Sequence, residues 1–103
     1  MDKTKYILTE VSAERARQDA KWGEQNHPDG TGGPSSEEMV RLAKARCDQA
    51  ARDGGLTYEM ILTEEFYEAL AEIDPKKLRT ELIQVAAVAV AWIECIDRRV
   101  SHG

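Results

Sequence analysis

Two helices and the turn that joins them lie in one stretch of the sequence. Residues 57–98 read TYEMILTEEFYEALAEIDPKKLRTELIQVAAVAVAWIECIDR. Thr57 can cap a helix whose apolar residues recur at helical spacing, and Asp74-Pro75 can end that helix and open another, with Asp74 as N-cap and Pro75 at the first helical position. The stretch therefore predicts an antiparallel helical hairpin, whose second helix should reach about Arg98.

The second helix of this hairpin is expected to be the most buried element of the fold. Its segment from Leu82 to Ile93 is apolar except for Gln84, and a helix that is apolar all round is surrounded on most sides. Alanines within the segment would let another helix approach closely. The covering helices come either from the same chain or from another subunit, and the sequence leaves both possibilities open.

Two more helices are expected before the hairpin. Thr9 can cap a helix that runs from about Glu10 to Trp22. Ser35 and Glu38 have the spacing of a capping box and would open the next helix, which Gly54-Gly55 would end. No alternating strand pattern and no internal repeat is present. The sequence therefore predicts an all-α, four-helix bundle.

The segment between the first two helices, residues 23–34, is expected to be a loop. It is dense in Gly, Pro, Asn and Asp, which regular elements do not tolerate. Gly23 would end the preceding helix in a left-handed conformation. Loops of this length inside a compact domain tend to be functional or mobile.

Composition limits the classes of protein that fit. The chain has 103 residues, of which 42% are apolar and 32% charged, as expected for one globular domain over residues 1–103. No segment is suited to span a membrane or to serve as a secretory leader, so we expect a cytoplasmic protein. The net charge of −5 argues against nonspecific nucleic-acid binding. Cys47 and Cys95 lack metal-ligand spacing and are expected to be reduced thiols.

Acidic side chains gather in the predicted hairpin. Residues three apart share one face of a helix, so Glu65 lies beside Glu68, and Glu81 lies beside Gln84. Folding the chain about Asp74-Pro75 sets Glu68 opposite Glu81 and Glu65 opposite Gln84, because the members of each pair are equally far from the turn. Spacing and turn together therefore predict one acidic cluster.

The predicted cluster calls for a compensating charge. Glu81 falls in the middle of the apolar face of its helix and should be partly buried. A buried carboxylate near two others is driven toward its neutral form unless a cation compensates it. We expect Mg²⁺, with Mn²⁺ as a substitute, because hard ions take carboxylate, water and phosphate oxygens. The alternative is that Lys76, Lys77 or Arg79 pairs with the buried carboxylate.

These acidic residues resemble the signature of a known family. Phage and bacterial MazG-like proteins, which are all-α nucleoside triphosphate pyrophosphohydrolases, carry EExxE and, after a short link, ExxD. Residues 64–68, EEFYE, match the first half, and residues 81–84, ELIQ, match the second except that Gln replaces Asp. The resemblance covers residues 57–97, and residues 18–28, QDAKWGEQNHP, resemble the amino-terminal segment of such proteins. It implies a homodimer or homotetramer.

The resemblance also implies a set of metal ligands. Glu65, Glu68 and Glu81 would hold Mg²⁺ together with Gln84, which offers a neutral amide oxygen. The missing charge at Gln84 is expected to weaken metal binding or to reduce the number of ions held. A later ExxD, residues 94–97, makes Asp97 a possible additional ligand.

The implied reaction is attack of water on the α-phosphorus of a nucleoside triphosphate, giving a nucleoside monophosphate and pyrophosphate. Glu64 or Glu65 would orient or deprotonate the attacking water. The substrate would be a ribo- or deoxynucleoside triphosphate, and nucleotide-pool control in a phage, such as conversion of dGTP to dGMP, is one implied role.

Substrate recognition is expected outside the acidic cluster. Trp22 offers a surface on which a base can stack, and Asn26 and His27 offer hydrogen-bonding groups. Ordinary core or loop positions are the alternative for these residues. Candidates for contacts with phosphate, each also explained as an ordinary surface residue, are Lys21, Lys44 and Arg46.

A different class of function also fits the sequence. The chain would then be a catalytically weak helical binding or regulatory module, which keeps the fold and uses the acidic hairpin to bind a protein. Metal binding separates this possibility from the hydrolase.

Overall fold

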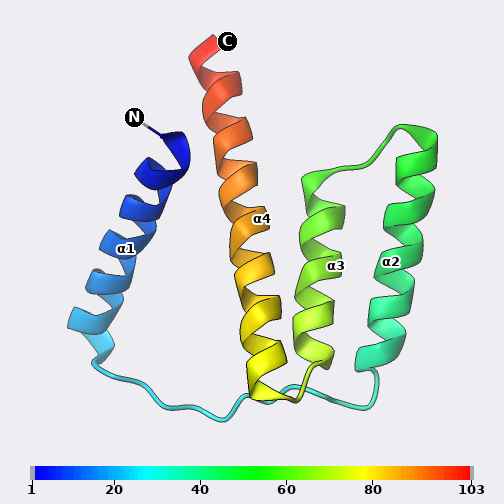
Figure 1. The fold of residues 1–103 in the computed structure, drawn as a ribbon, viewed down its shortest axis with the longest axis horizontal. Helices are drawn as coiled ribbons and strands as arrows, with labels where there is room; N and C mark the ends of the chain where they lie inside the picture. Colours follow the sequence, from blue (N-terminus) through cyan, green and yellow to red (C-terminus); the bar gives the residue numbers. More distant parts are fainter. Residues whose placement is uncertain (1, 103) are drawn as a thin grey trace. The chain divides into compact units, whose positions relative to one another are not determined.

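The regular structure of this protein is entirely helical over residues 2–102, which a computed structural model describes. Its elements are α1 (Lys3–Trp22), α2 (Ser36–Asp53), α3 (Tyr58–Ala71) and α4 (Pro75–His102) (Figure 1). No strand occurs among the described residues, so the predicted all-α fold with four helices is confirmed. Over the same residues, no helix combines the length and the apolar character needed to cross a bilayer.

The helices are divided between two compact units. The first unit contains α1 and the part of α4 from Val90 onward. The second unit, residues 29–89, contains α2, α3 and the first half of α4. Because α4 is continuous, it contributes to both units. A single domain over residues 1–103 remains a prediction.

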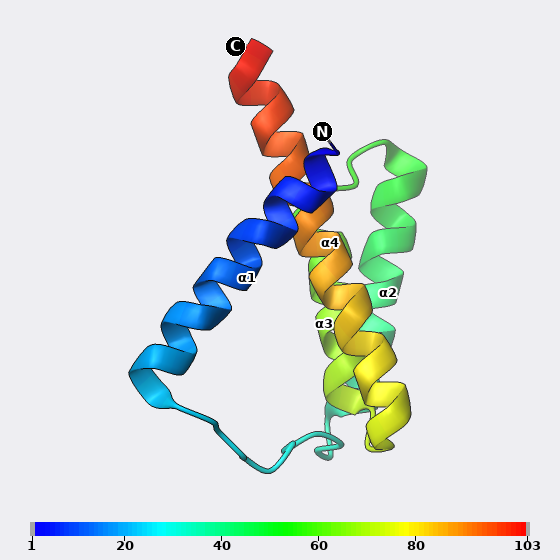
Figure 2. The ribbon, with the colours of Figure 1, turned by 60° about the vertical axis from the view of Figure 1, so that its left-hand side comes forward.

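The second unit contains the predicted hairpin. In it α2, α3 and the first half of α4 lie side by side, and each runs antiparallel to the next (Figures 1 and 2). The Thr57 hydroxyl accepts a hydrogen bond from the Met60 N–H at 3.2 Å, and the Asp74 carboxylate accepts one from the Lys77 N–H at 3.0 Å. Both predicted caps are therefore confirmed. α4 continues to His102, past the expected end at Arg98.

The core of the second unit is built from rather small side chains. Its buried residues are Ala43 and Cys47 of α2, Ala69 of α3 and Leu78 of α4. Ala69 is only 1% exposed. Small side chains at a helix contact let the two backbones approach closely. α2 and α4 are thereby held against α3.

The predicted loop is confirmed, since residues 25–33 have no regular structure. Gly32 donates its N–H to the Leu70 carbonyl at 2.8 Å, which ties the end of this loop to the last turn of α3. Its φ of +79° is a conformation that glycine adopts without strain, and a β-carbon there would collide with Cγ2 of Ile73. Glycine is therefore required where the chain enters α2.

The expected start of the first helix is wrong. α1 begins at Lys3 rather than near Glu10, because the Asp2 carboxylate accepts a hydrogen bond from the Thr4 N–H at 2.9 Å and caps the helix. Thr9, the predicted cap, lies within the helix and donates its hydroxyl to the Lys5 carbonyl at 2.9 Å. A hydroxyl can cap a helix or bond back to the preceding turn, and spacing does not distinguish these roles.

The helix expected after Ser35 is present, but the predicted capping box is wrong. The Ser35 side chain makes no capping hydrogen bond, and the Glu38 carboxylate accepts hydrogen bonds from Arg41 instead. At its other end α2 stops before Gly54, as the Gly54-Gly55 pair predicted, and Gly54 has the left-handed conformation of a helix cap, with φ of 76° and ψ of 14°. Gly23 ends α1 as expected, but its ψ of −169° differs from the expected left-handed conformation.

The first unit joins α1 to the later half of α4. The Thr4 hydroxyl donates a hydrogen bond to the Glu94 carboxylate at 2.6 Å, and Ile7 and Val90 are buried. Nearly all other residues of α1 are exposed. The amino-terminal end of α1 therefore provides most of its packing.

The expectation that α4 is surrounded on most sides is wrong for the single chain. Leu82 and Ile83 are 52% and 56% exposed, although they lie in the most apolar segment. In the second unit α3 covers the face of α4 that carries Glu81. Successive residues of a helix point about 100° apart, so Leu82 and Ile83 point away from that face.

Candidate metal centre

Three carboxylates from two helices come together in the second unit. Glu65 and Glu68 project from α3, and Glu81 projects from α4. One carboxylate oxygen of each lies within 4.8 Å of those of the other two, and all three side chains are half-buried. The antiparallel turn at Asp74-Pro75 produces this convergence, as the spacing predicted.

The separation of these oxygens fits a small divalent cation. Mg²⁺ binds oxygen at about 2.0–2.1 Å in octahedral geometry, so its adjacent ligands are about 3.0 Å apart and its opposite ligands about 4.2 Å apart. The three oxygens lie within 4.8 Å of one another, so side-chain adjustments on the order of 1–2 Å would bring them to these separations. The group contains no His or Cys, which argues against zinc.

The electrostatics of the cluster also favour a cation. Burial raises the pKa of Glu65, and the charges of Glu81 and Glu64 raise it further. Burial likewise raises the pKa of Glu68, with further contributions from Glu65, Glu81 and Glu64, while Lys44 opposes the shift. These carboxylates repel one another, so a bound cation would lower the free energy of the folded chain.

Pairing with the basic residues of early α4 does not explain the cluster. Lys76, Lys77 and Arg79 are all exposed. The ion pairs found among the described residues lie elsewhere, and none includes Glu81. Lys44 of α2 is a basic residue whose positive charge lowers the pKa of Glu68.

A cavity of about 350 Å³ borders the cluster, and it has a wall that sequence reasoning missed. Glu68 and Glu81 line it together with Glu37 and Val40 of α2 and Ala71 of α3. Glu37 and Val40 lie on one face of α2, a signal visible in the sequence. This spacing alone did not predict the cavity wall, because no residue near α2 in the sequence indicated that this face of α2 packs against the hairpin.

The other predicted residues of the site differ in their surroundings. Glu64 is half-buried and adds its negative charge to the environment of Glu65 and Glu68. Gln84 is exposed, whereas the three carboxylates are half-buried. Asp97 is exposed in the part of α4 that belongs to the first unit. Metal binding by Gln84 or Asp97 therefore stays a prediction.

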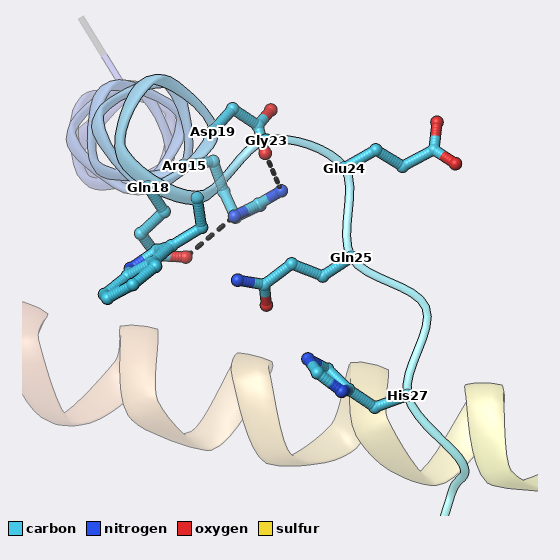
Figure 3. Close-up of a pocket in the computed structure, with 8 residues that line it drawn as sticks. Arg15, Gln18, Asp19, Gly23, Glu24, Gln25 and His27 are labelled. Carbon is cyan, nitrogen blue, oxygen red and sulfur yellow. Dashed lines mark hydrogen bonds and ion pairs between the residues drawn. The ribbon is translucent and has the colours of Figure 1, made fainter.

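The first unit contains a separate pocket of about 840 Å³ at the end of α1 (Figure 3). Two of the predicted substrate-binding residues line it, Trp22 and His27. The Trp22 side chain is well exposed, with the residue at 62%. Lining residues that sequence reasoning did not select are Arg15, Gln18, Asp19, Gly23, Glu24 and Gln25.

Polar groups that line this pocket, and Lys21 and Asn26, which do not, are partly engaged in contacts with their neighbours. Arg15 donates hydrogen bonds to Gln18 and Asp19, both at 2.7 Å (Figure 3). The ammonium group of Lys21 lies 4.8 Å from the centre of the Trp22 ring, a cation–π contact. Asn26 donates a hydrogen bond to Glu24 at 3.1 Å. The pocket therefore offers an aromatic surface with amide and guanidinium groups nearby.

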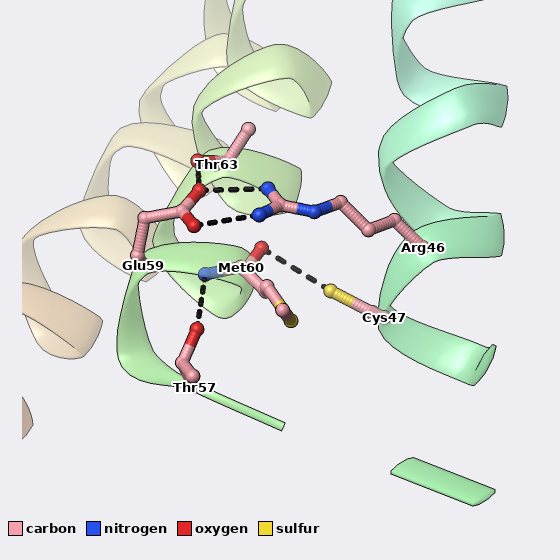
Figure 4. A network of polar contacts seen from close by, with 6 residues as sticks. All are labelled: Arg46, Cys47, Thr57, Glu59, Met60 and Thr63. Carbon is pink, nitrogen blue, oxygen red and sulfur yellow. Dashed lines mark hydrogen bonds and ion pairs between the residues drawn. The ribbon is translucent and has the colours of Figure 1, made fainter. Parts of the chain in front are cut away.

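A polar network joins α2 to α3 (Figure 4). Arg46 donates two hydrogen bonds to the Glu59 carboxylate, each at 2.8 Å, and the Thr63 hydroxyl donates a third at 3.1 Å. The Cys47 thiol donates a hydrogen bond to the Met60 carbonyl, with sulfur and oxygen 3.2 Å apart. Arg46, a candidate for phosphate contact, is thus engaged in holding α2 against α3.

Both cysteines are free thiols, as expected. Burial raises the pKa of the Cys47 thiol, and the nearby Glu64 charge raises it further. A raised thiol pKa reduces the thiolate fraction and hence the reactivity. Cys47 therefore serves as a core residue of α2.

Comparisons with protein-family models, with curated proteins and with solved structures found no match to this chain.

Proposed function

We propose that this chain is a metal-dependent nucleoside triphosphate pyrophosphohydrolase of the MazG-like kind. The observation that carries the proposal is the convergence of Glu65, Glu68 and Glu81 from the two helices of a hairpin, with oxygens within 4.8 Å of one another. Repulsion among these carboxylates supports a role that includes a divalent cation.

In this proposal Glu65, Glu68 and Glu81 hold Mg²⁺ or Mn²⁺, and Gln84 is a candidate for a weaker contact. A cation held there would neutralise the acidic cluster and would supply stabilisation of phosphate charge and activation of a water. Glu64 or Glu65 orients the attacking water or accepts its proton. Water adds at the α-phosphorus, the bond to the β-phosphate oxygen breaks, and pyrophosphate leaves.

Recognition of the base is proposed for the pocket at the end of α1. Trp22 offers the stacking surface, and His27 offers a hydrogen-bonding group in the same pocket. Lys21 and Asn26 lie beside these residues in the sequence and complete the proposed substrate-binding set. dGTP is one of the substrates to test first.

A second copy of the chain is proposed to cover the apolar surface that a single chain leaves exposed. In the second unit that surface includes Phe66 of α3, Ile73 of the link between α3 and α4, and Leu82 and Ile83 of α4. Ile73 is 71% exposed. Burial of large apolar side chains is the main favourable term in association, which supports a four-helix bundle assembled as a homodimer or homotetramer.

The proposal is tested by measuring pyrophosphate release with Mg²⁺ and with Mn²⁺ over a panel of ribo- and deoxynucleoside triphosphates. Glu65→Gln and Glu81→Gln are each expected to lower the rate at least about 100-fold, since loss of a metal ligand should exceed the effect of losing a residue that supports one. Glu10→Gln is the matched control, because it makes the same chemical change at an exposed position of α1.

Two outcomes would contradict the proposal. Rates that neither Glu65→Gln nor Glu81→Gln changes would remove the acidic cluster from the reaction. Absence of activity on every nucleotide would favour the binding or regulatory module.

A further inference from the structure

The cavity beside the three carboxylates is bordered by a fourth acidic residue from another helix. Glu37, in the first turn of α2, lines this cavity together with Glu68 of α3 and Glu81 of α4. Glu37 is not among the oxygens that lie within 4.8 Å of one another. Glu37 is an exposed residue that borders the same cavity as Glu68 and Glu81.

The cavity leaves room for water beside the three carboxylates. Its volume of about 350 Å³ is many times the roughly 30 Å³ that one molecule of liquid water occupies. Mg²⁺ gives up its waters reluctantly and keeps several of them in protein sites. A cation held by the three clustered carboxylates would therefore extend bound waters into the cavity.

The position of Glu37 is set by the packing of α2. Val40, one turn later, lines the same cavity. Lys44 lies a further turn along, and its positive charge lowers the pKa of Glu68. Residues spaced in this way share one face of a helix, so this face of α2 points toward the cluster. The bidentate bond between Arg46 and Glu59 helps to hold α2 in place.

We propose that Glu37 holds the water shell of the divalent cation, its carboxylate accepting hydrogen bonds from waters bound to an ion at Glu65, Glu68 and Glu81. This inference rests on the proposed function. Glu37 is a positioning residue here, because it acts through water and takes no part in bond making or breaking. Groups that hold metal-bound ligands in this way commonly affect metal affinity strongly.

The test is titration of the full chain with Mn²⁺ by calorimetry, without nucleotide. Glu37→Gln is expected to weaken Mn²⁺ binding about 10- to 100-fold. Glu38→Gln is the matched control, because it removes the same charge from the same turn of α2, at an equally exposed residue that pairs with Arg41 and is not among the residues lining the cavity. It should change the affinity by no more than about twofold, since only a screened long-range interaction with the cation would be lost. Glu68→Gln should reduce binding the most.

The outcomes distinguish this inference from the proposed function. Equal affinities for Glu37→Gln and Glu38→Gln, with binding lost in Glu68→Gln, would overturn the role of Glu37 and leave the metal centre intact. Wild-type protein that does not bind Mn²⁺, or Glu68→Gln protein that binds it normally, would overturn both.

A second variant separates position from charge and from folding. Glu37→Asp keeps the charge and shortens the reach, so it should bind Mn²⁺ more weakly than wild type while its Tm without metal stays close to that of wild type. Wild-type affinity in Glu37→Asp would show that only the charge matters, and would contradict the positioning role.

Discussion

α3 carries two carboxylate sites with opposite electrostatics. On one face, hydrogen bonds from Arg46 and then Thr63 lower the pKa of Glu59. On another face, burial and then neighbouring carboxylates raise the pKa of Glu65 and of Glu68. The chain itself balances the charge of Glu59 through Arg46, whereas a cation from outside is proposed to balance the charge of the cluster. This difference assigns a structural role to Glu59 and supports a cation-binding role for the cluster of Glu65, Glu68 and Glu81.

The largest expected effect separates the two sites by metal binding. Mg²⁺ at about 100 times its Kd should stabilise the wild-type chain by about 2.7 kcal/mol, which raises the Tm by roughly 10 °C or more for a domain of this size. The double variant Glu65→Gln/Glu68→Gln should show no rise, and Glu59→Gln should keep it. Thermal unfolding followed by circular dichroism measures both, and a rise retained in the double variant would break the comparison.

A smaller effect is expected from pH in the absence of divalent ions. Because the pKa values of Glu65 and Glu68 are raised in the folded state, the folded chain binds more protons there than the unfolded chain, and its stability falls as pH increases through those values. Glu65→Gln/Glu68→Gln should therefore raise the Tm at pH 7 by roughly 2–6 °C, limited by solvent screening. The gain should disappear near pH 4.

The sign of that pH effect should reverse at the paired site. The pKa of Glu59 is lowered, so its stabilising effect is present at neutral pH and is lost as pH falls through the folded-state value. Glu59→Gln should accordingly lower the Tm at pH 7 and have less effect in acid. The same pH dependence for both variants would contradict the distinction.

The smallest expected effect comes from Arg46→Met. Arg46 and Glu59 are about half exposed, at 50% and 53% of their side chains, and exposed ion pairs contribute little to stability. The variant should lower the Tm slightly and leave Mn²⁺ affinity within about twofold of the wild-type value. A large loss of Mn²⁺ affinity would show that the α2–α3 network controls the metal centre.

Helices were predicted well where the signals are local. Thr57 and Asp74 cap α3 and α4 as expected, because a cap depends on the residues of one turn. The predictions for Thr9 and Ser35 were wrong, since a hydroxyl has several partners within reach and the local pattern does not select one.

Burial was predicted less well than secondary structure. The apolar segment of α4 indicated helix correctly, but Leu82 and Ile83 are exposed in the single chain. Hydrophobicity shows that a surface gains free energy when it is covered. It does not show which helix, or which copy of the chain, covers it.

Sequence alone determined that Glu65, Glu68 and Glu81 converge, because helical spacing and the Asp74-Pro75 turn set which residues face each other across the hairpin. Only the tertiary structure decided that Glu37 borders the same cavity. α2 reaches the hairpin through close packing around small core residues. Contacts between helices that are distant in sequence are not specified by the residues of one turn. The acidic cluster was therefore predictable, whereas the position of Glu37 beside it was not.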